Sequence, residues 1–207
     1  DDELGRRLLL EDRVELPRLY LAWRTPALFA EDDAGLDMLA EVLSGGKTSR
    51  LYRRLVHEER VATDVSAVQG SRELDGWFSI TATAAPGHQL TDLDRIIGEE
   101  LERLEADGPT DDEIERGLAQ VDAQFVYRLQ TVGGFNGRSD QLNAYNVYTG
   151  DPGFMSADRD RYSDATPALV RTLAERWLTP SARIALSVVP EGAAAEALRG
   201  SSPAVVS

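Results

Sequence analysis

The two histidines of the chain are the first residues to consider as carriers of chemistry. His57 precedes Glu58 and Glu59 in the segment LSGGKTSRLYRRLVHEERVATDVSA (43–67), and His88 lies in the segment PGHQL. A zinc site on one helix needs ligands three or four residues apart, as in H-x-x-E-H, because only these spacings turn two side chains toward one ion. Zinc binding by His57 therefore depends on its neighbours at those spacings.

The residues three and four positions from His57 do not complete a metal site. They are Arg53, Arg54, Arg60 and Val61. Neither arginine nor valine is a zinc ligand. His88 falls in a predicted loop, so a site with both histidines would depend on the tertiary fold alone. We therefore predict a solvated helix end at His57-Glu58-Glu59 and no metal ligand in this chain.

The segment SGGKTS (44–49) has the glycines, lysine and hydroxyl residues of a phosphate-binding loop. That motif, G-x-x-x-x-G-K-[ST], follows a buried strand and needs a glycine five residues before the second one. Here the segment follows a predicted helix, and the required position is Glu41. We therefore predict a turn between two helices.

The remaining polar motifs also provide no catalytic residue. The nucleophile motif G-x-S-x-G does not occur, and the carboxylate pairs in EDDAGLD, EELERLEADG and TDDEIE are typical of exposed helix faces in so acidic a chain. The segment FNGRSDQLNAY (135–145) favours a buried polar network around a helix kink over a binding site. From the residues alone, we predict no catalytic centre.

Hydrophobic periodicity predicts four strands and several helices. Alternation in RVELPRLYLAW (13–23) places Leu19, Leu21 and Trp23 on one face of a strand. A hairpin is predicted from 63–71 and 76–84, and a closing strand at 183–189. Helical spacing covers the ranges near 31–44, 48–59, 91–106 and 111–129, resumes near Leu142, and starts again at Thr166.

The order of these elements predicts an α+β domain. Strands and helices do not alternate regularly, and neighbouring strands are joined as in a hairpin. We therefore expect an antiparallel sheet covered on one face by helices, with a lead-in at 1–13, a domain at 14–190 and a linker or tail at 191–207.

Composition and charge exclude several kinds of partner. The 36 acidic and 22 basic residues give a formal net charge of -14, which repels nucleic acid and anionic membrane surfaces. The absence of cysteine excludes disulfides and thiolate metal sites, and no apolar run reaches the roughly 18–20 residues of a membrane span. The abrupt charged start and the Ala- and Gly-rich end suggest a domain of a longer protein.

Three segments in order resemble the insulinase/pitrilysin family of zinc metallopeptidases. They are YLAWRTPALFAEDDAGLDMLAEVLSGGKTSRLYRRLVHEERVATDVSA, FSITATAAPGH and LTDLDRIIGEELERLEADGPTDDEIERG. The resemblance is to the metal-free, C-terminal type of peptidase domain and covers about 14–190. It implies the insulinase/mitochondrial-processing-peptidase-like metallohydrolase fold, in units that occur in pairs. One unit of each pair has H-x-x-E-H, and its glutamate acts as general base on a zinc-bound water.

The resemblance also implies which residues would contact a substrate. In many relatives the metal-free unit supplies an arginine and, seven positions on, a tyrosine, and these positions match Val56 and Thr63 here. Valine has no hydrogen-bond donor, and the threonine hydroxyl is on a much shorter side chain than tyrosine. We therefore predict that this unit lacks the auxiliary catalytic role as well.

The function implied is that of a non-catalytic, peptidase-like domain of a zinc metalloendopeptidase. Its expected partners are a zinc-bearing, H-x-x-E-H domain on the same or another chain and a peptide substrate, with no cofactor in this domain. The alternative is a standalone binding or scaffold module of the same fold. By analogy with bacterial relatives, we expect a periplasmic or envelope location.

Overall fold

A computed structural model describes residues 5–135 and 137–205 of the protein. Its strands form one six-stranded sheet in the order β3-β4-β2-β5-β1-β6. The strands are β1 (Arg7–Asp12), β2 (Arg18–Thr25), β3 (Ala62–Ser71), β4 (Gly76–Ala84), β5 (Ile184–Pro190) and β6 (Ser202–Pro203). The helices are α1 (Asp33–Ser44), α2 (Leu90–Asp107), α3 (Asp111–Gln130), α4 (Arg138–Thr149), α5 (Met155–Ser163) and α6 (Pro167–Trp177), with the short helices η1 (Tyr52–Glu58), η2 (Pro180–Ala182) and η3 (Ala194–Glu196).

The predicted α+β class is confirmed, and the sheet is mixed. The four strands β3, β4, β2 and β5 pair antiparallel, as expected. Strand β1 pairs parallel with β5 and with β6. It lies within the range 1–13 that was expected to be a lead-in. Its sequence RLLLED has three consecutive leucines instead of an alternating pattern, so periodicity did not predict it.

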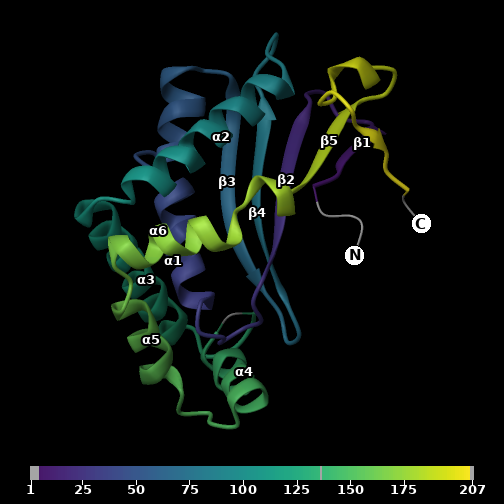
Figure 1. Cartoon of the computed structure of the whole chain (residues 1–207). Helices are drawn as coiled ribbons and strands as arrows, with labels where there is room; N and C mark the ends of the chain where they lie inside the picture. Colours follow the sequence, from purple (N-terminus) through teal and green to yellow (C-terminus); the bar gives the residue numbers. More distant parts are fainter. Residues whose placement is uncertain (1–4, 136, 206–207) are drawn as a thin grey trace.

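The core lies between the sheet and the helices on one of its faces. Figure 1 shows α1, α2 and α6 together on one side of the strands, with α4 near the lower end of the molecule. The predicted stripe of Leu19, Leu21 and Trp23 on β2 is fully or almost fully buried, and Phe78 and Ile80 of β4 lie beside it. These helices therefore cover one face of the sheet and leave the opposite face uncovered.

Local capping fixes where two of the helices begin. The Thr110 hydroxyl accepts from the backbone N–H of Glu113, and the Glu113 carboxylate accepts from the N–H of Thr110, which is the predicted capping box. At α6 the Thr166 hydroxyl accepts from the N–H of Leu169, and Pro167 takes the first helical position. Helix α5 was not predicted, because its exposed, charged sequence has little apolar periodicity.

Strand β3 is at one edge of the sheet, and α1 binds part of that edge. The backbone N–H of Ala67 donates to the Ser44 hydroxyl (2.7 Å), which lies 3.2 Å from the Ala67 carbonyl oxygen. One side chain at the end of α1 thus occupies both backbone groups of this residue. Within the described part of the chain, no helix is both long and apolar enough to cross a membrane.

Candidate functional site

The segment around His57 is the helix η1, which has π-helical hydrogen bonding. His57, Glu58 and Glu59 are exposed there, in agreement with a solvated helix end. His88 is exposed in the turn before α2. Among residues 5–135 and 137–205, no three or more metal-ligating side chains are grouped to hold an ion. The lack of a metal site in the whole chain stays a prediction.

The arginine that opens this segment connects it to the start of α3. The Arg50 guanidinium donates to both carboxylate oxygens of Glu113 (2.8 and 2.7 Å) and to the carbonyl oxygen of Gly108 (2.9 Å). Both charged side chains are mostly buried. Two of the segments that resembled the peptidase family are therefore in direct contact, which gives them a structural role.

The structure places Val56 and Thr63 in different surroundings. Val56 is half-buried and packs against the core, whereas Thr63 is exposed at the start of β3. The Thr63 hydroxyl donates to a carboxylate oxygen of Asp64 (3.1 Å). Their match to the arginine and tyrosine of relatives stays a prediction.

The carboxylates of EDDAGLD were expected on an exposed helix face, and this expectation is wrong for Asp33. Its side chain is buried at the start of α1, where it accepts from Ser71, from the N–H of Phe29 (3.0 Å) and from the guanidinium of Arg161 (2.9 Å). Phe29 has a positive φ of 62° at this point. Asp33 therefore joins the β3–β4 hairpin, α1 and α5, so a structural role explains its burial.

The polar segment FNGRSDQLNAY, which is partly in α4, contributes to the hydrogen-bonded network that includes Asp33 and Arg161. The buried phenol of Tyr145 donates to Asp158 (2.7 Å), and Arg161 donates to the other oxygen of Asp158 (2.9 Å). Burial, followed by the contact with Asp158, raises the pKa of Tyr145 well above its usual range. The predicted buried network is confirmed for Tyr145. It is wrong for Arg138, Asp140 and Asn143, which are exposed, and Asn136 lies outside the described residues.

A cavity of about 210 Å³ lies between α1, α3 and the edge of β3. Its polar lining includes Asp37 and Glu41 of α1, Arg128 of α3 and Tyr162 of α5. The Tyr162 phenol donates to Asp37 (2.7 Å). Burial raises the pKa of Asp37 to about 7, partly offset by this hydrogen bond, and burial also raises the pKa of Glu41. No sequence pattern indicated this group of polar residues, because Asp37 lies among the core residues of an apolar helix.

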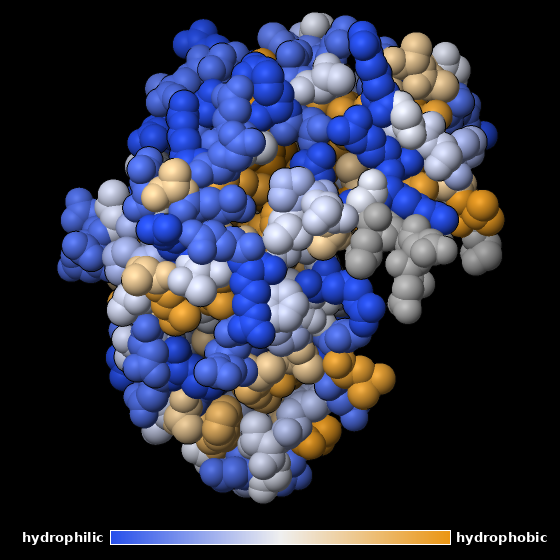
Figure 2. Space-filling model, in the orientation of Figure 1, coloured by the Kyte–Doolittle hydropathy of each residue, from blue (hydrophilic) through white to orange (hydrophobic). Residues whose placement is uncertain are grey.

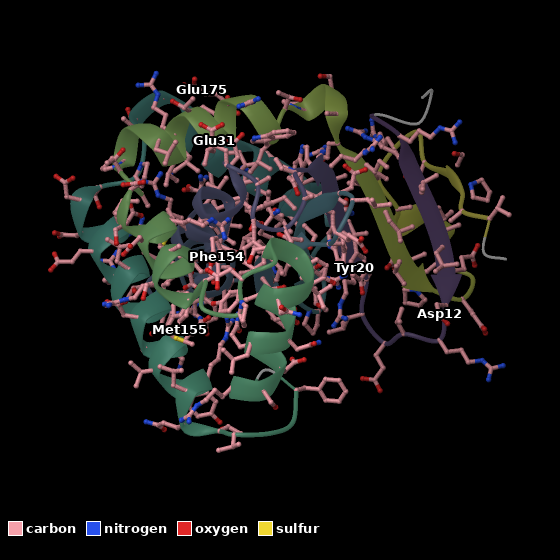
Figure 3. The ribbon with its side chains drawn as sticks, turned by 90° about the horizontal axis from the view of Figure 1, so that it is seen from below. Asp12, Tyr20, Glu31, Phe154, Met155 and Glu175 are labelled. Atoms are coloured by element: carbon pink, nitrogen blue, oxygen red, sulfur yellow. The ribbon has the colours of Figure 1, made fainter. Side chains whose placement is uncertain are left out.

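The face of the sheet opposite the helices is divided by residue type. Apolar side chains of β1 and β5 meet across the sheet, because Leu8 pairs with Leu186 and Leu10 with Val188. On β2 the same face has Arg18 and Tyr20. Figure 3 shows Tyr20 on the side of the sheet away from Glu175 of α6. The strands β4 and β3 continue this face with hydroxyl residues together with Asp64, Val68, Gly70 and Trp77.

A second apolar surface lies at the end of the molecule that contains α4. We define this apolar end by its exposed large hydrophobic residues, which are Val126, Tyr127, Val132, Phe135, Leu142, Val147 and Tyr148. Phe135 is 100% exposed. Figure 2 shows apolar patches in the lower part of the view, where Figure 1 places α4. So large a group of exposed apolar residues is typical of a contact surface.

The described residues form a layered α+β unit with two apolar surfaces and without a group of metal-ligating side chains. These features agree with the comparison to known families. A model of the peptidase M16 inactive domain matches residues 2–121. The chain belongs to the peptidase M16 inactive-domain family. The predicted resemblance to the metal-free type of peptidase domain is therefore confirmed.

Relatives of this M16 inactive domain include longer zinc proteases. An uncharacterized zinc protease of Streptomyces coelicolor is 26% identical over 185 residues, which cover 89% of this chain and 39% of the relative. The crystal structure of a protease from Helicobacter pylori shares the fold with a TM-score of 0.79 at 21% identity, over 92% of this chain and 45% of that one. A peptidase M16 inactive domain from Pseudomonas fluorescens has a TM-score of 0.74 at 15% identity, over 96% and 44%. The chain spans less than half the length of each of these proteins.

Proposed function

We propose that this M16 inactive domain packs against a zinc-bearing peptidase domain and forms part of the wall of a peptide-binding chamber. The partner domain would be on the same or another chain, and it would supply the H-x-x-E-H helix, the zinc ion and the general base. The apolar end is the observation that carries the proposal, because a surface of this kind is stable in water when another protein surface covers it.

The longer relatives support this role for the domain. The relative from Streptomyces coelicolor is named a zinc protease, and 39% of its length matches this chain. More than half of that protein therefore lies outside the match and could contain a metal-bearing unit. The helix-free face of the sheet is a second surface suited to face such a unit or a bound peptide.

The first experiment measures zinc content and the cleavage of a quenched fluorescent peptide library. We expect the 207-residue chain to bind no stoichiometric zinc and to cleave nothing, and the full-length protein to cleave in a chelator-sensitive manner. Full-length protein without zinc or cleavage would favour the alternative, a binding module of the same fold. Stoichiometric zinc in the 207-residue chain would contradict the proposal.

The packing itself is tested with variants of the apolar end. Phe135→Ser combined with Val147→Ser should weaken binding to the separately produced zinc-bearing domain by about tenfold or more, since buried apolar anchors dominate such interfaces. The matched control is Leu74→Ser, because Leu74 is equally solvent-facing at the β3–β4 turn (87% exposed). Equal binding by both variants in calorimetry would exclude the apolar end as the docking surface.

A further inference from the structure

We propose that Arg18, on the helix-free face of the sheet, binds a carboxylate group of a peptide. The site consists of Arg18 and Tyr20 of β2, Thr83 of β4 and a neighbouring cavity of about 340 Å³. This inference rests on the proposed function to the extent that it identifies the ligand as a peptide in the chamber. Binding at the site itself requires no zinc.

The register of the sheet fixes the position of Arg18. Its neighbours across the sheet are Thr83 on β4 and Val188 on β5. Side chains directly opposite one another on neighbouring strands point to the same face. Arg18 therefore stands where the apolar half of this face, formed by β5 and β1, meets its polar half.

The guanidinium of Arg18 is held in place by neutral groups. Its Nε donates to the Thr83 hydroxyl (2.8 Å), and its hydrogen bond to Tyr20 is the main cause that raises its pKa. Guanidinium has more N–H donors than these two acceptors use. Arg18 thus keeps its charge and has donors available for a further acceptor.

No carboxylate of the described residues forms a salt bridge with Arg18, although the chain is strongly acidic. Arg24, six residues along the same face of β2, donates to Asp75 (2.6 Å). Asp64 of β3 lies opposite Thr83, and its attraction is the smallest of the named causes that raise the pKa of Arg18. A fixed arginine without an ionic partner is suited to accept a carboxylate from outside the chain, because the pair forms two parallel charge-assisted hydrogen bonds.

The adjacent cavity favours a peptide over a free inorganic anion. Val14, Leu16 and Val188 form apolar walls beside the guanidinium, and Glu15 also lines the cavity. Apolar walls accommodate the side chain next to a carboxylate and strengthen the ion pair by excluding water. The negative charge of Glu15 should oppose the ligand, so neutralising it should strengthen binding.

The test uses acetyl-Leu-Leu with a free carboxylate and the same dipeptide with a terminal amide. In NMR titrations of the 207-residue chain, we expect the acid to bind about tenfold more tightly than the amide, because a hydrogen-bonded charge pair is lost with the amide. Acetyl-Asp-Leu-amide serves as a third probe, and it distinguishes a side-chain carboxylate from a C-terminal one.

Matched variants assign the effect to Arg18. Arg18→Gln should bind the acid and the amide equally, whereas Arg24→Gln should keep the preference and Glu15→Gln should increase it a few-fold. Arg18→Lys keeps the charge and should retain part of the preference, which provides a test if Arg18→Gln does not fold. Equal binding of acid and amide by the unchanged chain, or an unchanged preference in Arg18→Gln, would overturn the proposal.

The outcome is separable from that of the proposed function. Peptide binding is measured without zinc, cleavage or the partner domain. A result without carboxylate binding at Arg18 would therefore say nothing against docking through the apolar end. Conversely, a carboxylate preference in a chain that docks to no zinc-bearing domain would support the site and contradict the chamber.

Discussion

At the scale of single residues, Asp37 shows how a partly buried helix position changes the behaviour of a carboxyl group. It lies beside core residues of α1 and accepts a hydrogen bond from the Tyr162 phenol. Burial raises the pKa of Asp37 to about 7. The unfolded chain ionises this group near its ordinary pKa of 3.8, so folding takes up a proton between these two values.

Asp37→Asn should therefore remove a pH dependence of stability. In the unchanged chain, the Asp37 contribution to the free energy of unfolding is largest below about pH 4, falls as the pH rises toward 7, and then levels off, with a total change on the order of 4 kcal/mol. The asparagine variant should lose this fall and be the more stable protein at pH 7.5. Urea unfolding at several pH values measures both effects.

The control for this prediction is Asp160→Asn, since Asp160 is exposed on α5. It should leave the pH profile of the unfolding free energy unchanged. A profile of Asp37→Asn that runs parallel to that of the unchanged chain would show that Asp37 is already ionised in the folded protein.

At the scale of elements, Arg50 joins the start of η1 to the turn and cap that begin α3. Both Arg50 and Glu113 are mostly buried, at 12% and 14% side-chain exposure. A mostly buried ion pair matters for stability mainly when one partner is removed, because the remaining charge is then buried without a partner. The contact gives the segments SRLY and GPTDDE a shared structural role, since one supplies the cation and the other the acceptors.

Arg50→Lys should destabilise the domain by about 1–3 kcal/mol, because an ammonium group cannot form the bidentate pair and still reach Gly108. Thermal or urea unfolding measures the loss. The matched control is Arg53→Lys, whose salt bridge to Glu58 is solvent-exposed and should contribute less than about 0.5 kcal/mol. Similar effects of both substitutions would exclude a special role of the Arg50 pair.

Much of the element order could be predicted from the sequence, because alternation and helical spacing report burial directly. The stripe of β2, the β3–β4 hairpin and the caps of α3 and α6 are examples. Strand β1 could not be predicted, since its leucines do not alternate and its partner β5 lies more than 170 residues later in the chain. The surroundings of Asp37 and Arg18 also depend on such distant contacts.

At the scale of the whole molecule, charge sets the long-range behaviour of the domain. The net charge of -14 produces a negative field, which attracts cationic peptides and repels anionic ones. The positive charge of Arg18 attracts a carboxylate against this negative field only at short range. We therefore infer a preference for peptides that are basic overall, including peptides whose carboxylate is at the terminus.

On the proposed function, the full-length protein should cleave basic peptides a few-fold faster than acidic peptides of matched length. This difference should shrink as salt is raised, because ions screen attraction between exposed charges. Initial cleavage rates at two NaCl concentrations measure the effect, with a neutral peptide as the control. Equal rates for acidic and basic peptides at low salt would contradict an electrostatic preference.

The bond between Ser44 and Ala67 has a consequence for how the protein behaves in a crowded solution. An exposed edge strand can recruit a strand from another molecule and begin aggregation. Here the Ser44 hydroxyl already occupies both backbone groups of Ala67 near the middle of β3, so a foreign strand cannot pair continuously along that edge. One small hydroxyl group at the end of α1 thus helps to keep neighbouring copies apart.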